Sequence, residues 1–181
     1  LDSVVSLAEF IQNKPFTIQN ATKLLYSLYY QIHCLLENNI AISFIDLYDI
    51  MVIDNTHYYF CNCDKLYTIK KNNRIVITDF YDKTNSFLPP EFQTNTIMPF
   101  STFPTSAYYS LAIVILYCLH GTNITKPGTE PITHFTSDVS LNKSYNIDYN
   151  GILQKYCHTK LYHTLSICLI EDPKKRNPIL F

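Results

Sequence analysis

The sequence predicts a mainly helical domain of the α+β class that also contains small β-hairpins. Between residues 24 and 36, leucine and isoleucine recur at three- and four-residue steps, which indicates the buried face of a long helix. Segment 106–120 is apolar on every side, as expected of a helix in the middle of a domain. Two strand-like runs, 50–53 and 57–60, are joined by Asp-Asn-Thr and predict a hairpin.

In chain order, the first expected element is a short helix from Leu7 to Gln12, which ends before a proline. Thr17 then opens the long helix, and two asparagines after position 37 end it. Beyond the first hairpin, residues 66–69 and 74–77 flank a polar Lys-Lys-Asn-Asn turn, so we expect them to form a second hairpin.

The second half of the chain alternates between polar segments and helices. Residues 82–106 are rich in Pro, Thr, Ser and Asn and are expected to form a loop before the buried helix 106–120. Another polar loop is expected over 122–150, followed by one or two helices within 152–170. Asp172-Pro173 then opens a last turn, with proline at the first helical position.

Composition bounds the class of protein. The chain has 181 residues, enough for one domain with a real core, and we expect residues 1–181 to form it. A net charge of −1 gives no electrostatic reason to expect nucleic acid or an anionic membrane as a partner. The most apolar run, 111–119, is too short to span a bilayer. The bias toward Tyr, Asn, Ile and Lys is typical of an AT-rich coding genome, which leaves a viral or parasite source open.

The cysteines suggest a site only weakly. Cys61 and Cys63 are expected on one face of a strand, near His57, where they would supply part of a zinc site. No second ligand pair has suitable spacing, so we expect no metal site. Reduced cysteines then predict a cytoplasmic location, which would be the host cytoplasm for a viral protein.

Short motifs in a fixed order resemble the C-terminal lobe (C-lobe) of a protein kinase. Leu-Pro-Pro-Glu at 88–91 resembles the A-P-E motif, and Tyr-Ser-Leu-Ala at 109–112 resembles the central helix of that lobe. Residues 168–176 resemble the closing C-L-x-x-D-P-x-x-R signature, and residues 6–11 are similar to the stretch after the kinase hinge. The resemblance covers essentially the whole chain and makes residues 82–106 an activation-segment-like loop.

This resemblance implies one contact and one missing part. In the family, the A-P-E glutamate pairs with the arginine after D-P, which here are Glu91 and Arg176. A partly buried, bidentate pair of this kind would pin the activation segment to the lobe. The N-lobe, with its Gly-rich loop and nucleotide-positioning lysine, would lie before Leu1, and an isolated C-lobe cannot enclose ATP.

The residues that carry kinase chemistry are mostly replaced. A count without gaps puts Phe44 at the catalytic aspartate, and phenylalanine cannot accept a proton. The same count puts Asp49 at the metal-binding asparagine and Asn62 at the D-F-G aspartate. A gapped alignment instead puts Asp46 at the catalytic position. Asp79 lies in a tempting Ile-Thr-Asp-Phe-Tyr run, but it would leave too short an activation segment, so Asn62 is preferred.

These departures predict a catalytically inactive, kinase-like domain, a degenerate pseudokinase that serves as a protein-interaction scaffold or regulator. Such a domain needs no cofactor and has a protein as its partner, with self-association left open. Loop tyrosines such as Tyr81 and Tyr145 would suit an interface if exposed. A tyrosine-rich proteome would explain them equally well.

Two alternatives stay open. The chain would be the C-terminal half of an atypical Ser/Thr protein kinase if an N-lobe is encoded upstream. Asp46 would then be the base, and Asp49 with Asn62 or Asp64 would bind Mg²⁺ for ATP-dependent transfer. An unrelated, mainly helical fold would be favoured if the two residues of the expected ion pair lay far apart.

Overall fold

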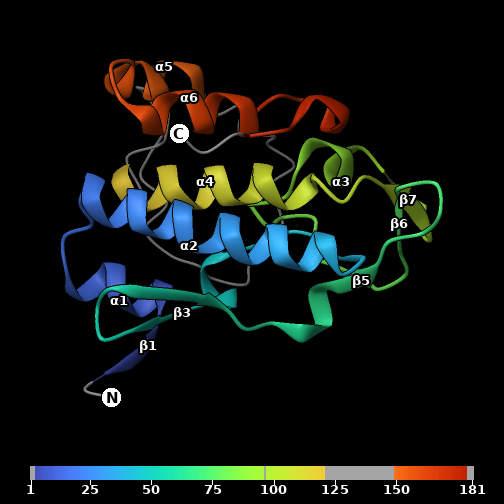
Figure 1. Ribbon diagram of the computed structural model, residues 1–181, viewed down its shortest axis with the longest axis horizontal. Coiled ribbons are helices and arrows are strands. Elements are labelled where there is room, and N and C mark those ends of the chain that lie inside the picture. Colours follow the sequence, from blue (N-terminus) through green and yellow to red (C-terminus); the bar gives the residue numbers. More distant parts are fainter. Residues whose placement is uncertain (1–2, 96, 121–148, 179–181) are drawn as a thin grey trace.

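The computed structural model describes residues 3–95, 97–120 and 149–178. It combines helices with three small antiparallel sheets, so the α+β class is confirmed. Helix α4 (Ser106–His120) runs through the middle of the molecule, with α2 (Ile18–Glu37) beside it (Figure 1). Helix α6 (Lys160–Cys168) covers α4 on another side.

The two predicted N-terminal helices are present, and each begins at a side-chain cap. In α1 (Leu7–Asn13) the cap is the hydroxyl of Ser6, and in α2 it is the hydroxyl of Thr17. Asn39, just beyond α2, takes a left-handed φ of 58°, which ends the helix. The stripe that predicted α2 is its buried face: Ala21, Leu24, Leu25, Leu28 and Ile32.

The predicted first hairpin is confirmed. Strands β3 (Ile50–Ile53) and β4 (His57–Phe60) pair antiparallel, and β1 (Val4–Ser6) adds to the other side of β3. Asp54 and Asn55 in the turn have φ values of 49° and 60°, which suits the right-handed twist of the two strands.

The outer edge of β4 is closed by a side chain from α2. Gln31 donates from Nε2 to the Tyr58 carbonyl at 2.8 Å and accepts the Phe60 N–H on Oε1 at 2.9 Å. The side-chain amide of glutamine presents an N–H donor and a carbonyl acceptor side by side, so Gln31 serves this edge as a neighbouring strand would.

The predicted second hairpin is wrong. Strand β5 (Leu66–Thr68) pairs with β2 (Ile40–Ile42), and β6 (Ile75–Ile77) pairs with β7 (Phe100–Thr102). The polar turn between β5 and β6 does form, since the Lys70 N–H bonds to the Arg74 carbonyl at 2.8 Å. The strands then diverge, because Ile75 to Ile77 pair with β7 and not with β5.

Residues 82–106 contain more regular structure than the predicted loop. They include β7 and the short helix α3 (Pro90–Thr94), which begins at a proline with pre-set φ. Phe92 of α3 is fully buried against Phe100 of β7, with ring centroids 5.2 Å apart. The composition of residues 82–106 did not predict β7 or α3, because proline and threonine are typical of loops.

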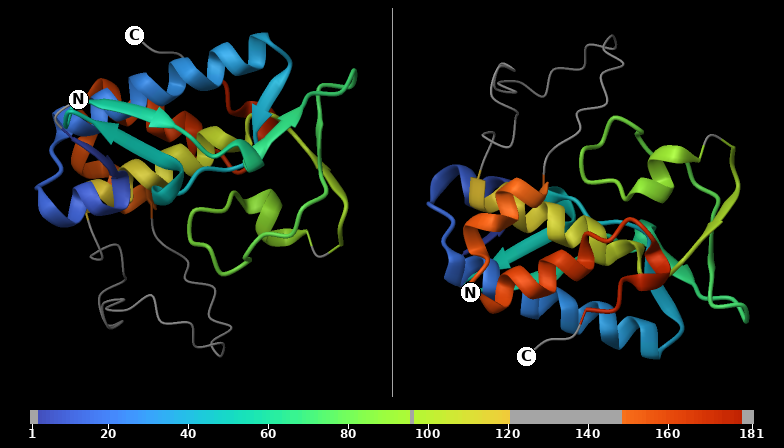
Figure 2. Two further views of the ribbon diagram at one scale, coloured as in Figure 1. Left: turned by 90° about the horizontal axis from the view of Figure 1, so that it is seen from below. Right: turned by 90° about the horizontal axis from the view of Figure 1, so that it is seen from above.

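Helix α4 is the core of the molecule, as its all-round apolar sequence predicted. Its residues from Ser106 to Leu116 are buried. In the two views of Figure 2, α4 lies between α2 and the segment that carries α3. The main apolar cluster joins α1, α2, α4 and α6, and a second cluster lies under α3, β6 and β7.

The predicted C-terminal helices and final turn are also present. Helix α5 (Tyr149–Leu153) precedes α6, and a 3₁₀ turn, Pro173–Lys175, follows with Asp172 as its cap. The loop predicted over 122–150 lies almost wholly outside the described residues. None of the described helices combines the length and apolar character needed to cross a lipid bilayer.

Candidate functional site

The segment between β2 and β3 folds into a tight polar turn around two aspartates. The Asp46 carboxylate accepts the Tyr48 N–H at 2.9 Å, and Asp49 Oδ2 accepts the Asp46 N–H at 2.8 Å. This reciprocal capping fixes the 3₁₀ turn Leu47–Asp49. Asp49 is only 2% exposed, so the turn places a carboxylate inside the fold, where it needs donors or a counter-charge.

Lys65 supplies that counter-charge. Its ammonium nitrogen lies 2.5 Å from Asp49 Oδ2 and 2.8 Å from Asp46 Oδ2. The same nitrogen lies 3.9 Å from the centre of the Phe44 ring, a cation–π contact. Sequence analysis missed Lys65, which reaches the aspartates because the β3–β4 hairpin returns the chain to their side.

Asn62 completes the polar cluster. Its Nδ2 donates to Asp49 Oδ1 at 2.7 Å, and its Oδ1 accepts the Asp64 N–H at 3.1 Å. Asn85 adds a long contact of 3.4 Å to Asp46 Oδ2. Every carboxylate oxygen of the two aspartates therefore accepts at least one hydrogen bond from the chain itself.

Phe44 packs as a core residue. It is 6% exposed, and its ring centre lies 5.6 Å from that of Phe92 and 6.1 Å from that of Tyr81. The Tyr81 hydroxyl donates to the Phe92 carbonyl at 2.8 Å. Tyr81 is therefore half-buried and not exposed as expected, because its ring joins this aromatic cluster of Phe44, Tyr81, Phe92 and Phe100. Tyr145 lies outside the described residues.

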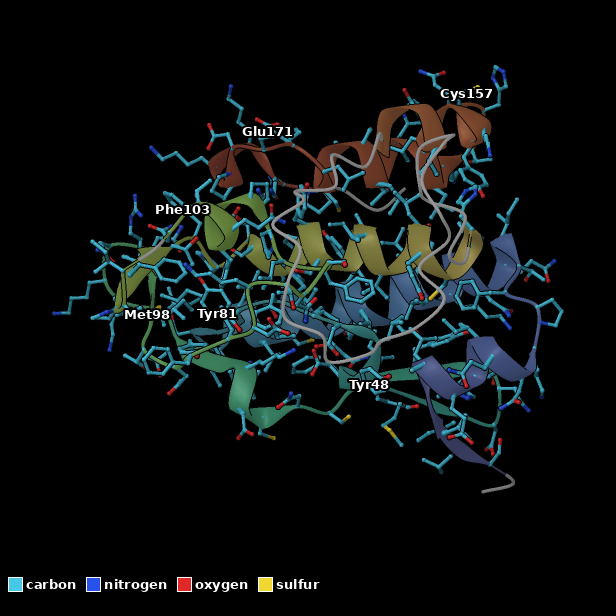
Figure 3. All side chains as sticks on the ribbon, turned by 180° about the vertical axis from the view of Figure 1, so that it is seen from behind. Tyr48, Tyr81, Met98, Phe103, Cys157 and Glu171 are labelled. Atoms are coloured by element: carbon cyan, nitrogen blue, oxygen red, sulfur yellow. The ribbon has the colours of Figure 1, made fainter. Side chains whose placement is uncertain are left out.

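An open cleft of about 490 Å³ lies next to the polar cluster. In the view of Figure 3, Tyr81 lies within the outline of the molecule, inward of Met98. The cleft is lined by Ser43, Phe44, Asp46, Asn62, Asp64, Lys65, Tyr67, Ile77, Asp79, Phe80, Tyr81, Asp82 and Asn85. Asp79, the aspartate of the Ile-Thr-Asp-Phe-Tyr run, thus lines the same cleft as Asp46 and Asn62.

The pKa values of Tyr67, which lines the cleft, and of Cys61, which directly precedes a cleft residue in the chain, are shifted. Burial, the hydrogen bond to Asp79 and the charge of that carboxylate together raise the pKa of Tyr67, whose hydroxyl donates to Asp79 Oδ2 at 2.8 Å. Burial raises the pKa of the Cys61 thiol, and the nearby Asp49 and Cys63 raise it further. Both groups therefore stay protonated at neutral pH, and Cys61 is not an activated nucleophile.

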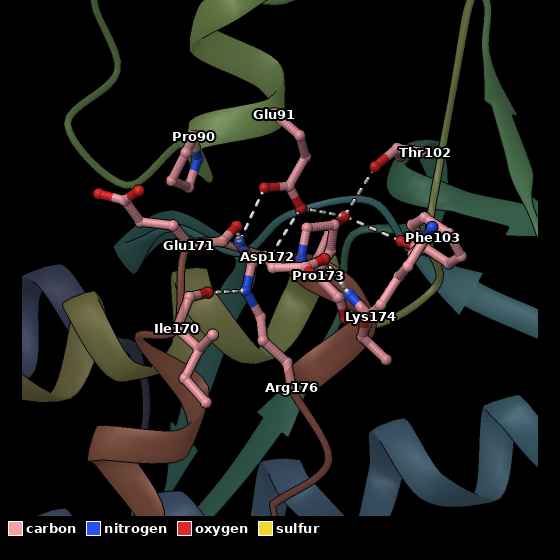
Figure 4. Close-up of polar contacts among 12 residues, drawn as sticks. Pro90, Glu91, Thr102, Phe103, Ile170, Glu171, Asp172, Pro173, Lys174 and Arg176 are labelled. Carbon is pink, nitrogen blue, oxygen red and sulfur yellow. Dashed lines mark hydrogen bonds and ion pairs between the residues drawn. The ribbon is translucent and has the colours of Figure 1, made fainter.

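A second polar centre lies at the first turn of α3. The Arg176 guanidinium donates to Glu91 Oε1 at 2.6 Å and to Glu91 Oε2 at 2.9 Å (Figure 4). Arg176 is fully buried and also donates to the carbonyls of Ile170 at 2.6 Å and Glu171 at 2.7 Å. The expected pair is present and bidentate, so α3 is tied to the C-terminal segment.

Ser106 also takes part in this centre, a role that no motif in the sequence predicts. Its hydroxyl donates to Glu91 Oε1 at 2.6 Å, which links α3 to the first residue of α4. The next residue, Ala107, is buried in the main core and has no polar side chain. The bracing of this region therefore comes from Ser106 and Glu91 rather than from the neighbouring position.

The residues weighed as zinc ligands do not form a site. Strand β4 ends at Phe60, so Cys61 and Cys63 do not share a strand face as expected. The His57 ring contacts the Thr56 hydroxyl at 3.0 Å. Within the described ranges, no group of three or more His, Cys, Asp and Glu side chains is arranged to hold a metal ion. None of the six cysteines is in a disulfide.

A scan against models of known protein families finds no match to this chain, and neither does a search of curated protein sequences.

Proposed function

We propose that the chain is a catalytically inactive, kinase-like domain that acts by binding other proteins, as a scaffold or regulator. One observation carries this proposal: the Lys65 ammonium lies between the Asp46 and Asp49 carboxylates. The two carboxylates that would act as base and metal ligand are thus both engaged in an ion pair with one cation of the same chain.

The chemistry of phosphoryl transfer explains why this arrangement matters. Transfer needs a carboxylate free to orient the attacking hydroxyl and oxygen ligands free to clamp Mg²⁺. Here Asn62 turns its Nδ2 toward Asp49, and its Oδ1 is already engaged by the Asp64 N–H. Phe44, which has no proton-accepting group, is held in the aromatic cluster.

A domain that acts by contact needs exposed apolar surface, and the three-stranded sheet offers some. Its inner residues Val52 and Tyr58 are buried, whereas Val4 and Tyr59 on the outer face are 49% and 46% exposed. Tyr48, at the turn beside this sheet, is 69% exposed. Exposed aromatic and aliphatic side chains on one face favour protein contacts.

One observation favours the alternative of an atypical kinase. Asp46 lines the open cleft, and its side chain is 16% exposed, so a substrate hydroxyl would find a carboxylate there. For Asp46 to accept a proton in this way, Lys65 would have to withdraw from it. The alternative therefore predicts that nucleotide and metal displace Lys65.

A thermal-shift titration with millimolar ATP, with and without Mg²⁺ or Mn²⁺, tests the proposal. We expect no metal-dependent rise in the Tm of the wild-type chain, because Lys65 holds the cation position. The Lys65→Met variant is the matched comparison, since it removes the ammonium and frees both carboxylates. A rise in Tm with Mn²⁺ is expected for that variant alone.

The contrary result is equally clear. A metal- and ATP-dependent rise in the wild-type Tm that Asp49→Asn abolishes would contradict the proposal and favour the kinase alternative. A protein partner recovered with the tagged chain should bind the Asp46→Asn variant as tightly as the wild type, because binding requires no chemistry at Asp46.

A further inference from the structure

The cleft beside the two aspartates has more negative charge than its lysine neutralises. Asp46, Asp64, Asp79 and Asp82 line it, and Lys65 is the only cation among its lining residues. The whole chain has a net charge of only −1, so negative charge is concentrated in this cleft. Asp64 is exposed, and no hydrogen bond or ion pair of its carboxylate is found among the described residues.

The rim of the cleft is aromatic. Phe80 is 94% exposed, so almost its entire ring is in contact with water although it directly follows the cleft residue Asp79. Tyr67 and Tyr81 are half-buried in the wall beside it. A phenylalanine this exposed contributes nothing to the core and gains apolar contacts only when something binds over it.

The contacts of Lys65 show which chemistry this lining accommodates. The Lys65 ammonium is held by carboxylates and by the face of the Phe44 ring. The rest of the lining, called the outer cleft below, contains the same two components, with Asp64, Asp79 and Asp82 as the carboxylates and Phe80 as the ring. None of the residues that line the outer cleft is a cation.

We propose that the outer cleft binds an arginine side chain from a basic segment of a partner protein. This inference rests on the proposed function, since it names the kind of partner that a binding domain would take. Arginine fits better than lysine because its planar guanidinium can stack on Phe80 and donate two hydrogen bonds to one carboxylate. A volume of about 490 Å³ is in the range of sites that hold a short peptide segment or a small ligand.

Fluorescence anisotropy with a labelled peptide tests this directly. The probe is an alanine peptide with three spaced arginines, and the matched control peptide has citrulline, a neutral isostere, at the same positions. We expect the arginine peptide to bind and the citrulline peptide to bind at least about tenfold more weakly, as for loss of charge-assisted hydrogen bonds. Added salt should weaken the binding of the arginine peptide only.

Three variants locate the binding. Asp64→Asn and Asp79→Asn should each weaken binding roughly tenfold, and asparagine at 79 still accepts the Tyr67 hydrogen bond. Phe80→Ala should weaken it about two- to fivefold, as for an exposed cation–π contact, without changing the Tm. Glu37→Gln removes one charge from an exposed site on α2, outside the cleft, and should leave binding unchanged.

Several results would overturn this inference. One is equal affinity for the arginine and citrulline peptides. Another is an equal loss of affinity for the arginine peptide in Asp64→Asn and Glu37→Gln. A dimer in sedimentation that Asp64→Asn dissociates would identify a second copy of this chain as the occupant and refute the partner proposal. The proposed function fails separately, by metal-dependent ATP binding, so absence of peptide binding would remove the cleft proposal and leave the non-catalytic proposal standing.

Discussion

Replacement of Glu91 by glutamine should destabilise the fold by about 3 kcal/mol, the lower end of the cost of breaking a buried ion pair. The substitution keeps the side-chain shape but leaves the Arg176 guanidinium without a counter-charge. Arg176 is fully buried, so water cannot solvate the charge that remains. The lower end applies because the Glu91 side chain is 12% exposed, which lets some water reach its end of the pair.

Urea unfolding followed by far-UV circular dichroism measures the effect, since the chain has no tryptophan for fluorescence. With a slope of about 2 kcal/mol per molar urea, a loss of about 3 kcal/mol moves the midpoint down by about 1.5 M. That loss is a large part of the stability of a typical domain, so the variant should also be more sensitive to proteolysis.

A double-mutant cycle separates the ion pair from general damage. Arg176→Met removes the charge but also leaves the carbonyls of Ile170 and Glu171 without their donor, so it should cost at least as much as Glu91→Gln. The double variant should be more stable than the sum of the single losses predicts, by about 1–3 kcal/mol. Glu37→Gln, at an exposed contact 3.5 Å from His33, is the control and should cost under about 0.5 kcal/mol.

The reasoning would be refuted if Glu91→Gln and Glu37→Gln shifted the urea midpoint equally. Strict additivity in the cycle would refute it as well. In either case the bidentate geometry would have no energetic role, and α3 would be held by its apolar contacts alone.

Three further predictions follow from single residues. Gln31→Met should cost about 2–4 kcal/mol in urea unfolding, because it leaves the Tyr58 carbonyl and the Phe60 N–H without partners at the β4 edge; a loss below about 1 kcal/mol would show that water replaces both bonds. Tyr58→Phe should stabilise by up to about 1 kcal/mol, because its buried hydroxyl has no partner among the described residues. Burial raises the pKa of Tyr58 to about 12, whereas an unperturbed tyrosine has a pKa of about 10, so the unfolded chain loses this proton at lower pH than the folded chain. The free energy of unfolding should therefore fall between about pH 10 and 12, and it should fall less steeply in Tyr58→Phe. Lys65→Met should cost about 2–4 kcal/mol at neutral pH, since Asp49 stays buried without its counter-charge; equal stability of variant and wild type would contradict the assigned pairing.

The helices were predictable because their signals are local. The stripe in α2, the helix start at Thr17 and the all-round apolar character of α4 depend only on residues within a few turns. The hairpin of β3 and β4 belongs to the same class, because its two strands are adjacent in the chain. For such elements, propensity and tertiary structure agree.

The strand partners of β5 and β6 were not predictable because they lie far away in the chain. Leu66 of β5 faces Ile42, and Ile77 of β6 faces Phe100, so both pairings depend on how the whole chain closes. Alternating pattern gives a strand its buried face but does not identify its neighbour. Adjacent strands usually pair, and that expectation produced the wrong hairpin.

Part of the candidate site was predicted from the sequence, and its central lysine was not. Motif spacing brought Asp46, Asp49 and Asn62 to attention, and the structure places them within one polar cluster. Lys65 was missed because a lysine in a turn between two strands usually points into solvent. Its role is visible only in the folded chain, where the β3–β4 hairpin brings it next to the aspartates. A lysine across a predicted hairpin from two aspartates is the signal that would have found it.

The packing of Phe44 has a consequence for how this chain can change over generations. A carboxylate at position 44 would lie under Phe92 and Tyr81 in a site that is only 6% exposed, and burying an unpaired charge there would cost several kcal/mol. A single Phe44→Asp substitution would therefore destabilise the surrounding aromatic cluster. Selection for stability alone is therefore enough to keep an apolar residue at position 44. A charged residue could replace it only if several of its aromatic neighbours changed as well.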